Sequence, residues 1–160
     1  MPLVGIVAKN REIQSIRKEI KGKNIEIIEI TKEGIKNIRN IKFEEIIFLQ
    51  NINLAEEEYK YMNEIISNAQ YLVLNGDIEI DILKKIHLQK PIKLITFGFN
   101  SKTTITISSV NDEKIIVCLQ RDIEKSNGEI LESQEQQIIY QNSKNIYYNL
   151  VVFIINELHN

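Results

Sequence analysis

Residues 71–77 read Tyr-Leu-Val-Leu-Asn-Gly-Asp, a fully apolar run that ends abruptly in polar residues. Such a run predicts a strand at 71–74 that is buried on both faces, as the strands of parallel sheets are. Helical spacing of apolar residues precedes it from 54 to about 69 and follows it from about 80 to 88, before Pro91 and another strand at 92–99. This alternation of strand and helix is typical of an α/β fold.

The same alternation extends back to the start of the chain. Strands are predicted at 3–8, 25–30 and 45–50. A helix at 11–21 joins the first two strands, with Asn10 as its N-cap and Gly22 at its end. A short helix marked by Ile35, Ile38 and Ile41 leads to the third strand. Parallel strands with crossover helices are therefore expected throughout residues 1–100.

Beyond Asn100 apolar and polar residues alternate one by one. Strands at 104–108 and 115–119, on either side of a polar turn at 111–112, predict an antiparallel hairpin. A loop containing Asn127 and Gly128 leads to more strand-like sequence at 138–140. The chain then ends in a helix at 145–158 that is apolar nearly all round, which predicts deep packing on the sheet or a subunit contact.

These elements predict one domain over residues 1–160, which is an ordinary length for a single hydrophobic core. The expected fold is a three-layer, Rossmann-like α/β domain with a mostly parallel sheet. Alternating strands and helices occupy 1–100, an antiparallel extension occupies 101–142, and the terminal helix occupies 145–158.

The composition excludes several classes of protein. Lys and Arg total 20 against 22 for Asp and Glu, so the basic excess of a nucleic-acid-binding protein is absent. The longest apolar run, at 150–155, is far shorter than the ~20 residues that cross a bilayer. Cys118 is the only cysteine and lies in an apolar run, which is typical of a small buried residue. We expect a cytoplasmic protein that binds neither nucleic acid nor membranes.

The polar residues at the strand ends are the candidate ligand-binding residues. In an open parallel sheet, ligands bind beyond the carboxyl ends of the strands, where the connecting loops meet. Because Asn, Gly and Asp also end strands and cap helices, a purely structural role is the alternative at each position. The candidates from the alternating half of the chain are Lys9, Asn10, Asn51, Asn75, Asp77 and Asn100.

Motifs for catalysis are absent. A nucleoside triphosphatase needs a glycine-rich loop after its first strand, and only Ala8, Lys9 and Asn10 stand there, so neither this loop nor a dinucleotide-binding motif is present. His87 and His159 have no Cys or His at metal-ligand spacing. Asp77 and Asp81 resemble helix caps more than a cation site. We expect no catalytic constellation, no metal site and no cofactor.

Three segments, in order, resemble the central domain of the Mur ligases, the ATP-dependent enzymes that add amino acids to peptidoglycan precursors. Residues 71–77 resemble the strand that ends in Asn and paired Asp in that family, and residues 92–100 resemble its next strand, which ends in Thr-Tyr-Gly. Residues 144–150 resemble the His-Asn-x-x-Asn start of a later helix. The resemblance adds Asn145 to the candidates and implies residual nucleotide contacts at Asn75, Asp77 and Asn145.

The sequence also departs from this family. The phosphate-binding loop is missing, Lys144 replaces the motif histidine, and Asn149 lies one residue beyond the second motif asparagine. The resemblance therefore implies a shared scaffold without the ligase chemistry. The leading hypothesis is a non-catalytic protein that acts through a protein partner or self-association, and the apolar terminal helix and the hairpin edge favour a dimer. The alternatives are a small-molecule module for a nucleotide or cell-wall precursor, and an enzyme that uses Asp77 with Lys9.

Overall fold

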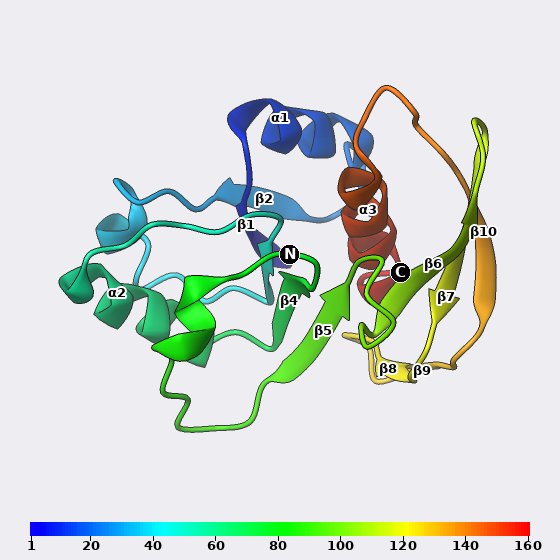
Figure 1. The fold of residues 1–160 in the computed structure, drawn as a ribbon. Coiled ribbons are helices and arrows are strands. Elements are labelled where there is room, and N and C mark those ends of the chain that lie inside the picture. The colour runs from blue at the N-terminus through cyan, green and yellow to red at the C-terminus, as the bar shows by residue number, and fades with distance from the viewer. The chain divides into compact units, whose positions relative to one another are not determined.

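The computed structural model describes all residues from 1 to 160, and Figure 1 shows their secondary structure. An eight-stranded, mostly parallel sheet has the order β10-β7-β6-β5-β4-β3-β1-β2, and β8 pairs with β9 in a small second sheet. The predicted α/β, Rossmann-like fold is confirmed. The chain divides into two compact units, here called the N-terminal unit (Met1–Leu74 and Ile78–Leu94) and the C-terminal unit (Asn75–Asp77 and Ile95–Asn160).

The N-terminal unit contains the alternating elements. In chain order these are β1 (Leu3–Val7), α1 (Asn10–Glu19), β2 (Glu26–Glu29), the 3₁₀ turn η1 (Ile35–Asn37), β3 (Glu45–Phe48), α2 (Glu56–Ser67), β4 (Tyr71–Asn75) and the 3₁₀ turn η2 (Asp81–Lys84). β1 pairs in parallel with both β2 and β3, and β3 pairs in parallel with β4. The winding direction therefore reverses at β1, and the carboxyl ends of β1 and β3 are the position at which sheets of this kind bind ligands.

The apolar runs form the core of this unit because they are strands buried on both faces. Every residue of β3 and β4 is buried, as expected for central strands of a parallel sheet. The helices contribute one apolar face each. Their buried residues are Ile13 and Ile16 in α1 and Met62, Ile65 and Ile66 in α2.

The helix predicted at 80–88 is wrong, because only the single turn η2 forms there. Two side chains from elsewhere bind the backbone donors of this segment. Asn51 Oδ1 accepts a hydrogen bond from the Asp81 N–H at 2.9 Å, and Asn63 Oδ1 accepts one from the His87 N–H at 2.8 Å. An α-helix needs the His87 N–H for its own ladder, so tertiary bonding replaces the second turn. The short helix expected around 35–41 likewise forms only η1.

The start of α1 also differs from the prediction. Lys9, not Asn10, is the N-cap, and Asn10 is already helical. The backbone N–H of Lys9 donates to Glu12 Oε1 at 3.3 Å, and Ala55 donates to Glu58 Oε1 at 2.7 Å at the start of α2. This is the half of a capping box that requires only a glutamate at the third helical position.

The C-terminal unit contains the antiparallel strands and the last helix. β5 (Lys93–Phe97) ends in it, and β6 (Ile105–Val110), β7 (Lys114–Leu119), β8 (Ile123–Glu124), β9 (Ile130–Leu131), β10 (Glu135–Ile139) and α3 (Ile146–Leu158) follow. The predicted hairpin is confirmed as β6 and β7. The expected loop around Asn127 and Gly128 is in fact the turn between β8 and β9. β10 pairs antiparallel with β7.

The terminal helix α3 is buried almost all round, as its composition predicts. Every residue from Tyr148 to Ile155 is buried, and so is Leu158. A helix with so little polar surface is stabilised chiefly by packing, at roughly 25 cal/mol for each Å² of apolar surface removed from water. Across the whole chain, no helix combines the length and the apolar character that a membrane span requires.

Candidate functional site

Asp77 is the centre of a polar cluster in the C-terminal unit. Its Oδ2 accepts hydrogen bonds from the Phe99 N–H at 2.7 Å and from the Tyr147 hydroxyl at 2.9 Å. Its Oδ1 accepts one from the Asn100 N–H at 2.9 Å. Charge-assisted bonds of this kind are stronger than neutral ones. The carboxylate therefore holds the loop after β5 and the first turn of α3 together.

Gly98 lets the loop approach this carboxylate. Its φ is +145°, and a Cβ built there would lie 2.6 Å from both Cγ and Oδ2 of Asp77. Only glycine combines this backbone conformation with that clearance. The carboxylate position is set from the other side by Asn75, whose Oδ1 accepts the Asp77 N–H at 3.0 Å.

The structure thus brings three predicted site residues together, namely Asn75, Asp77 and Asn100. These side chains form hydrogen bonds within the protein, and Asn100 Oδ1 also accepts the N–H of Lys102 at 2.9 Å within the same loop. Tyr147 is the fourth member of the cluster, and the sequence analysis did not single it out. It lies 70 residues beyond Asp77. No local pattern links two positions so far apart, so no signal in the sequence points to this pair.

Tyr147 has an altered acidity. Partial burial, together with the adjacent carboxylate of Asp77, raises the pKa of the Tyr147 phenol from 10.0 to about 12. Burial disfavours the phenolate through desolvation, and the Asp77 carboxylate disfavours it by accepting the hydrogen bond of the phenol and by its like charge. The ring also contacts Phe99, with 6.3 Å between the ring centroids in an edge-to-face arrangement. Tyr147 is therefore a protonated hydrogen-bond donor at neutral pH.

Asn145 has a structural role in the same unit. Its Oδ1 accepts the N–H of Tyr148 at 2.8 Å, which makes it the N-cap of α3. Asn149 is buried and bonds to both the N–H and the carbonyl of Gln141, at 2.9 and 3.3 Å. These two asparagines fix the start of α3 and the chain that leads into it.

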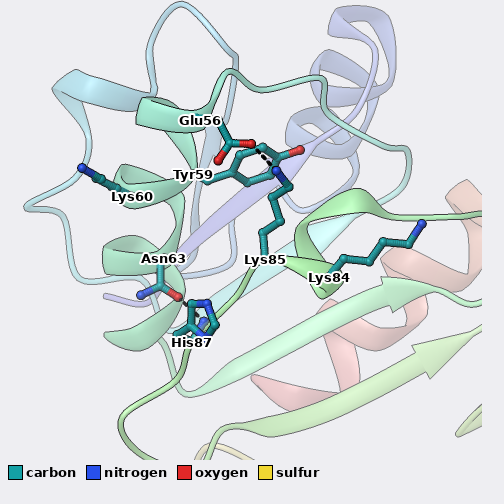
Figure 2. A pocket seen from close by; sticks show the side chains of 7 residues that line it. All are labelled: Glu56, Tyr59, Lys60, Asn63, Lys84, Lys85 and His87. Carbon is teal, nitrogen blue, oxygen red and sulfur yellow. Dashed lines mark hydrogen bonds and ion pairs between the residues drawn. The ribbon is translucent and has the colours of Figure 1, made fainter.

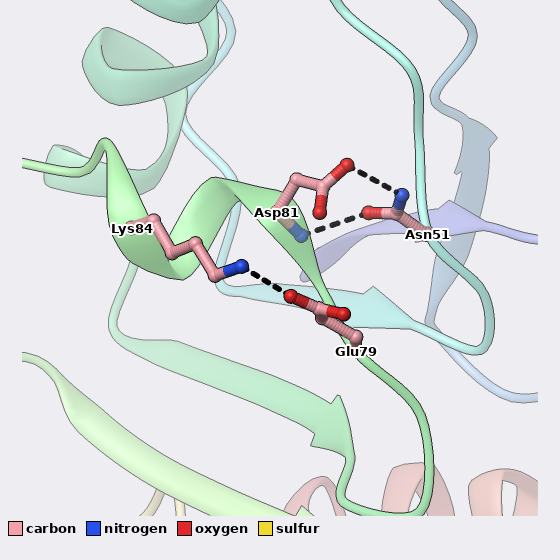
Figure 3. Close-up of polar contacts among 4 residues, drawn as sticks. All are labelled: Asn51, Glu79, Asp81 and Lys84. Carbon is pink, nitrogen blue, oxygen red and sulfur yellow. Dashed lines mark hydrogen bonds and ion pairs between the residues drawn. The ribbon is translucent and has the colours of Figure 1, made fainter.

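Lys9, Asn10 and Asn51 lie in the N-terminal unit, at the carboxyl ends of β1 and β3. Asn51 and Asp81 form a reciprocal pair, drawn in Figure 3. Asn51 Nδ2 donates to Asp81 Oδ2 at 2.9 Å while Asn51 Oδ1 accepts the Asp81 N–H at 2.9 Å. Beside this pair, the ammonium of Lys84 forms an ion pair with Glu79. The two hydrogen bonds between Asn51 and Asp81 connect the loop after β3 to η2.

The side chains of Asn10 and Lys9 differ in their contacts. Asn10 Nδ2 donates to Glu29 Oε2 at 3.2 Å, which links the start of α1 to the end of β2. The exposed side chain of Lys9 makes no such contact, so its ammonium is the one predicted charge at this sheet edge that remains available to a ligand. One isolated ammonium can attract an anion but does not define its position.

Metal chemistry has no donor set in this chain, since nowhere do three or more His, Cys, Asp or Glu side chains gather around a common point. The chain matches no protein-family model, and no curated protein matches it significantly. Inferences about function therefore rest on the residues and contacts of this chain alone.

The edge strand β10 has backbone N–H and C=O groups that bind no neighbouring strand. Backbone hydrogen bonds join Gln134 to Leu119 and Tyr140 to Glu113. Between these positions only every second residue of an antiparallel strand bonds to its neighbour. The residues between the bonded positions, Glu135, Gln137 and Ile139, therefore direct their N–H and C=O groups away from β7. All three side chains are exposed, and Ile139 is 82% exposed. Figure 1 shows β10 beside β7, with no strand on its outer side.

Proposed function

We propose that this protein is a non-catalytic Rossmann-like domain that acts by self-association, and that β10 pairs antiparallel with β10 of a second copy. The observation that carries the proposal is the outward row of Glu135, Gln137 and Ile139, whose backbone groups have no strand partner. Natural edge strands are usually protected by Lys, Pro or a bulge. Residues 135–140 contain no Lys or Pro, and the pairing of β10 with β7 is regular.

The outward row is complementary to itself. A twofold axis through Gln137 places Gln137 opposite its own copy and Glu135 opposite Ile139 of the second copy. Each such pair exchanges two main-chain hydrogen bonds, so the three pairs supply roughly six. The two Gln137 amides face each other on one side of the joined sheet and can bond across the axis.

Charge favours the same register. Lys114 lies directly opposite Ile139 on β7 and on the same face of the sheet. In the proposed pair, Glu135 of the second copy lies on the other side of Ile139. The exposed isoleucine is then flanked by a lysine and a glutamate of opposite charge, once in each half of the dimer. Because the outward row is complementary to itself, the occupant that we propose is a second copy.

The catalytic alternative receives less support from the contacts. Asp77, which the enzyme hypothesis pairs with Lys9, accepts three internal hydrogen bonds. These bonds occupy most of the acceptor capacity of the carboxylate, although Asp77 itself is exposed. These bonds support a role for Asp77 in holding the fold, which fits a non-catalytic protein.

Sedimentation velocity between about 1 and 200 µM tests the proposal, because short interfaces give dissociation constants in the micromolar range. We expect a monomer–dimer equilibrium in the wild-type protein. Gln137→Pro removes one outward N–H at an edge position that tolerates proline, and should leave only monomer. Gln137→Ala keeps the backbone donor and should still dimerise. A wild-type protein that stays monomeric at 200 µM, or a Gln137→Pro variant that dimerises normally, would contradict the proposal.

We further propose that the domain is related to the central domain of the Mur ligases. The order β4, β5, antiparallel strands and α3 supports this, as does Asn145 at the start of α3. Calorimetric titration with ATP and Mg²⁺, and with UDP-linked muropeptides, measures whether nucleotide binding remains. Flat titrations are expected from the non-catalytic scaffold. Saturable binding that Asn75→Ala abolishes would favour the small-molecule alternative.

A further inference from the structure

A cavity of about 410 Å³ lies in the N-terminal unit, between α2 and the chain that follows β4. Figure 2 shows that the Lys85 ammonium pairs with Glu56 and that the Asn63 side chain accepts the His87 N–H. Lys60 extends away from Asn63 and His87 in the same view. The polar groups of this lining therefore do not converge on a common point, as those of a ligand site do.

A second cavity, of about 370 Å³, lies beside the edge strand β2, near the end of α1. β2 is the last strand of the eight-stranded sheet, at the end opposite β10. Arg17 of α1 and residues 25–27 are among the residues that line this cavity. There is therefore open space beside the second edge of the sheet.

The hydrogen bonds of β2 show which of its backbone groups face this space. The N–H groups of Glu26 and Ile30 donate to carbonyl groups on the β1 side, at 3.0 and 2.9 Å. The bonds of a parallel pair are evenly spaced, and only every second residue of an edge strand faces its neighbour. Ile27 and Glu29 therefore direct their N–H and C=O groups outward, away from β1.

Arg17 binds one of these outward groups. Its Nε and Nη2 both donate to the carbonyl oxygen of Ile27, at 3.3 and 3.1 Å. At these distances the guanidinium stands where the backbone nitrogen of an added strand would have to lie. Arg17 thus covers the β2 edge, as side chains do at many natural edge strands. The outward backbone groups of β10 have no such cover.

We propose that β2 is a second pairing edge for another copy of this chain, and that Arg17 keeps it closed so that self-association ends at a dimer. This inference rests on the proposed pairing through β10. With β10 used in the dimer, β2 forms both outer edges of the joined sheet. If these edges were open, further copies would add to them without limit.

The sequence of β2 allows it to pair with a second copy once Arg17 is removed. A twofold axis at Ile27 places Ile27 opposite its own copy in an antiparallel pair, and each glutamate of β2 opposite an isoleucine. In the wild-type protein, both copies would bring Arg17 to this axis. The two guanidinium groups would then repel each other and occupy both Ile27 carbonyl groups. Arg17 therefore blocks the register that would otherwise be available.

Sedimentation velocity of the full chain between about 1 and 200 µM tests this proposal. We expect Arg17→Met to form species larger than a dimer, in amounts that rise with concentration, whereas the wild-type protein stops at the dimer. Lys18→Met is the matched control, because it makes the same change of charge and side chain at the next residue of α1. It should behave as the wild-type protein does. Thermal melts show whether each variant keeps its fold.

The double variant Arg17→Met with Gln137→Pro separates this proposal from the pairing through β10. It should form only dimers, through β2, whereas Gln137→Pro alone should stay monomeric. In the double variant the outward amide hydrogens of Ile27 and Glu29 should exchange with solvent about tenfold more slowly than in Gln137→Pro. A wild-type monomer together with an Arg17→Met dimer that protects Ile27 would refute the pairing through β10 and support the closed β2 edge.

Three other results would overturn the role of Arg17. The first is a folded Arg17→Met variant that grows no larger than the wild-type protein up to about 200 µM. The second is a double variant that stays monomeric over the same range. The third is equal growth of Arg17→Met and Lys18→Met, which would show that loss of surface charge alone drives the association.

Discussion

Asp77 shows how a side chain that resembles a ligand-binding residue is used by the fold itself. Its position after a buried strand is evident from the sequence, and the structure confirms that strand as β4. Its partners are not evident, because the N–H groups of Phe99 and Asn100 become accessible only through the conformation of Gly98. A strand end can therefore be located from residue patterns, whereas the question of which atoms meet there depends on distant loops.

Substitution of Gly98 tests this arrangement. Gly98→Ala places a Cβ against the Asp77 carboxylate and forces alanine into a rare backbone conformation, so we expect a loss of about 2–4 kcal/mol in the free energy of unfolding. Gly128→Ala is the matched control, since Gly128 also has a positive φ but open space around its Cβ position. It should cost only about 1–2 kcal/mol. Chemical denaturation measures both values.

A double mutant separates the two causes. In an Asp77→Ala background the carboxylate is absent, so Gly98→Ala should cost less than it does in the wild-type background, and the remaining cost is that of the backbone conformation. Equal costs of Gly98→Ala in both backgrounds would contradict the close contact that the structure shows.

The raised pKa of Tyr147 predicts a loss of stability at high pH. The phenol has a pKa of about 12 in the folded protein and 10.0 as its ordinary value, so the folded state holds the proton more tightly. The resulting stabilisation is fully present below pH 10 and is lost as the pH rises from 10 through 12. Unfolding free energies measured between pH 9 and 12 should fall less steeply in Tyr147→Phe than in the wild-type protein. Identical slopes would contradict the prediction.

At the scale of elements, the apolar periodicity predicts strands and long helices well and short helices poorly. α3 is predicted almost to the residue because its apolar surface must be buried in any arrangement. The segment at 80–88 has a comparable helical pattern, yet Leu83 and Leu88 are exposed and Asn63 binds the His87 N–H. Tertiary hydrogen bonds decide the conformation of such a weakly amphipathic segment, and the residues that form these bonds lie elsewhere in the sequence.

The N-cap of α3 supplies a prediction at this scale. Asn145→Ala leaves the N–H of Tyr148 without its side-chain acceptor and should lower the free energy of unfolding by about 1 kcal/mol. Asn145→Ser keeps an acceptor of similar reach and should restore most of that loss. Asn160→Ala, at the exposed end of the chain, is the control and should have no effect. Urea denaturation curves with unchanged slopes would give these differences directly.

At the scale of the whole molecule, the division into units was not predicted, since composition and length indicate a single domain over 1–160. The sequence has no linker because the units are not consecutive segments: residues 75–77 belong to the C-terminal unit although they lie between two parts of the N-terminal unit. Boundaries of this kind leave no shift in composition for a sequence analysis to detect.

This interleaving predicts that the C-terminal unit does not fold from residues 95–160 alone. Such a fragment lacks Asp77 and therefore the acceptor for Phe99, Asn100 and Tyr147. We expect it to melt without a cooperative transition in circular dichroism. A fragment of residues 75–160, which regains Asp77, is the comparison and should be more ordered. Cooperative melting of the shorter fragment near the wild-type temperature would contradict the prediction.

The contacts of Asp77 also imply an order of events while the chain is being synthesised. Asp77 emerges from the ribosome before its loop donors, which follow 22 and 23 residues later, and long before Tyr147, which follows 70 residues later. At roughly 5–20 residues per second, the carboxylate spends several seconds in water without its last donor. The hydrogen bond from Tyr147 to Asp77 is thus among the last contacts to form during synthesis. A nascent chain that stalls before residue 147 lacks this bond between the loop after β5 and α3.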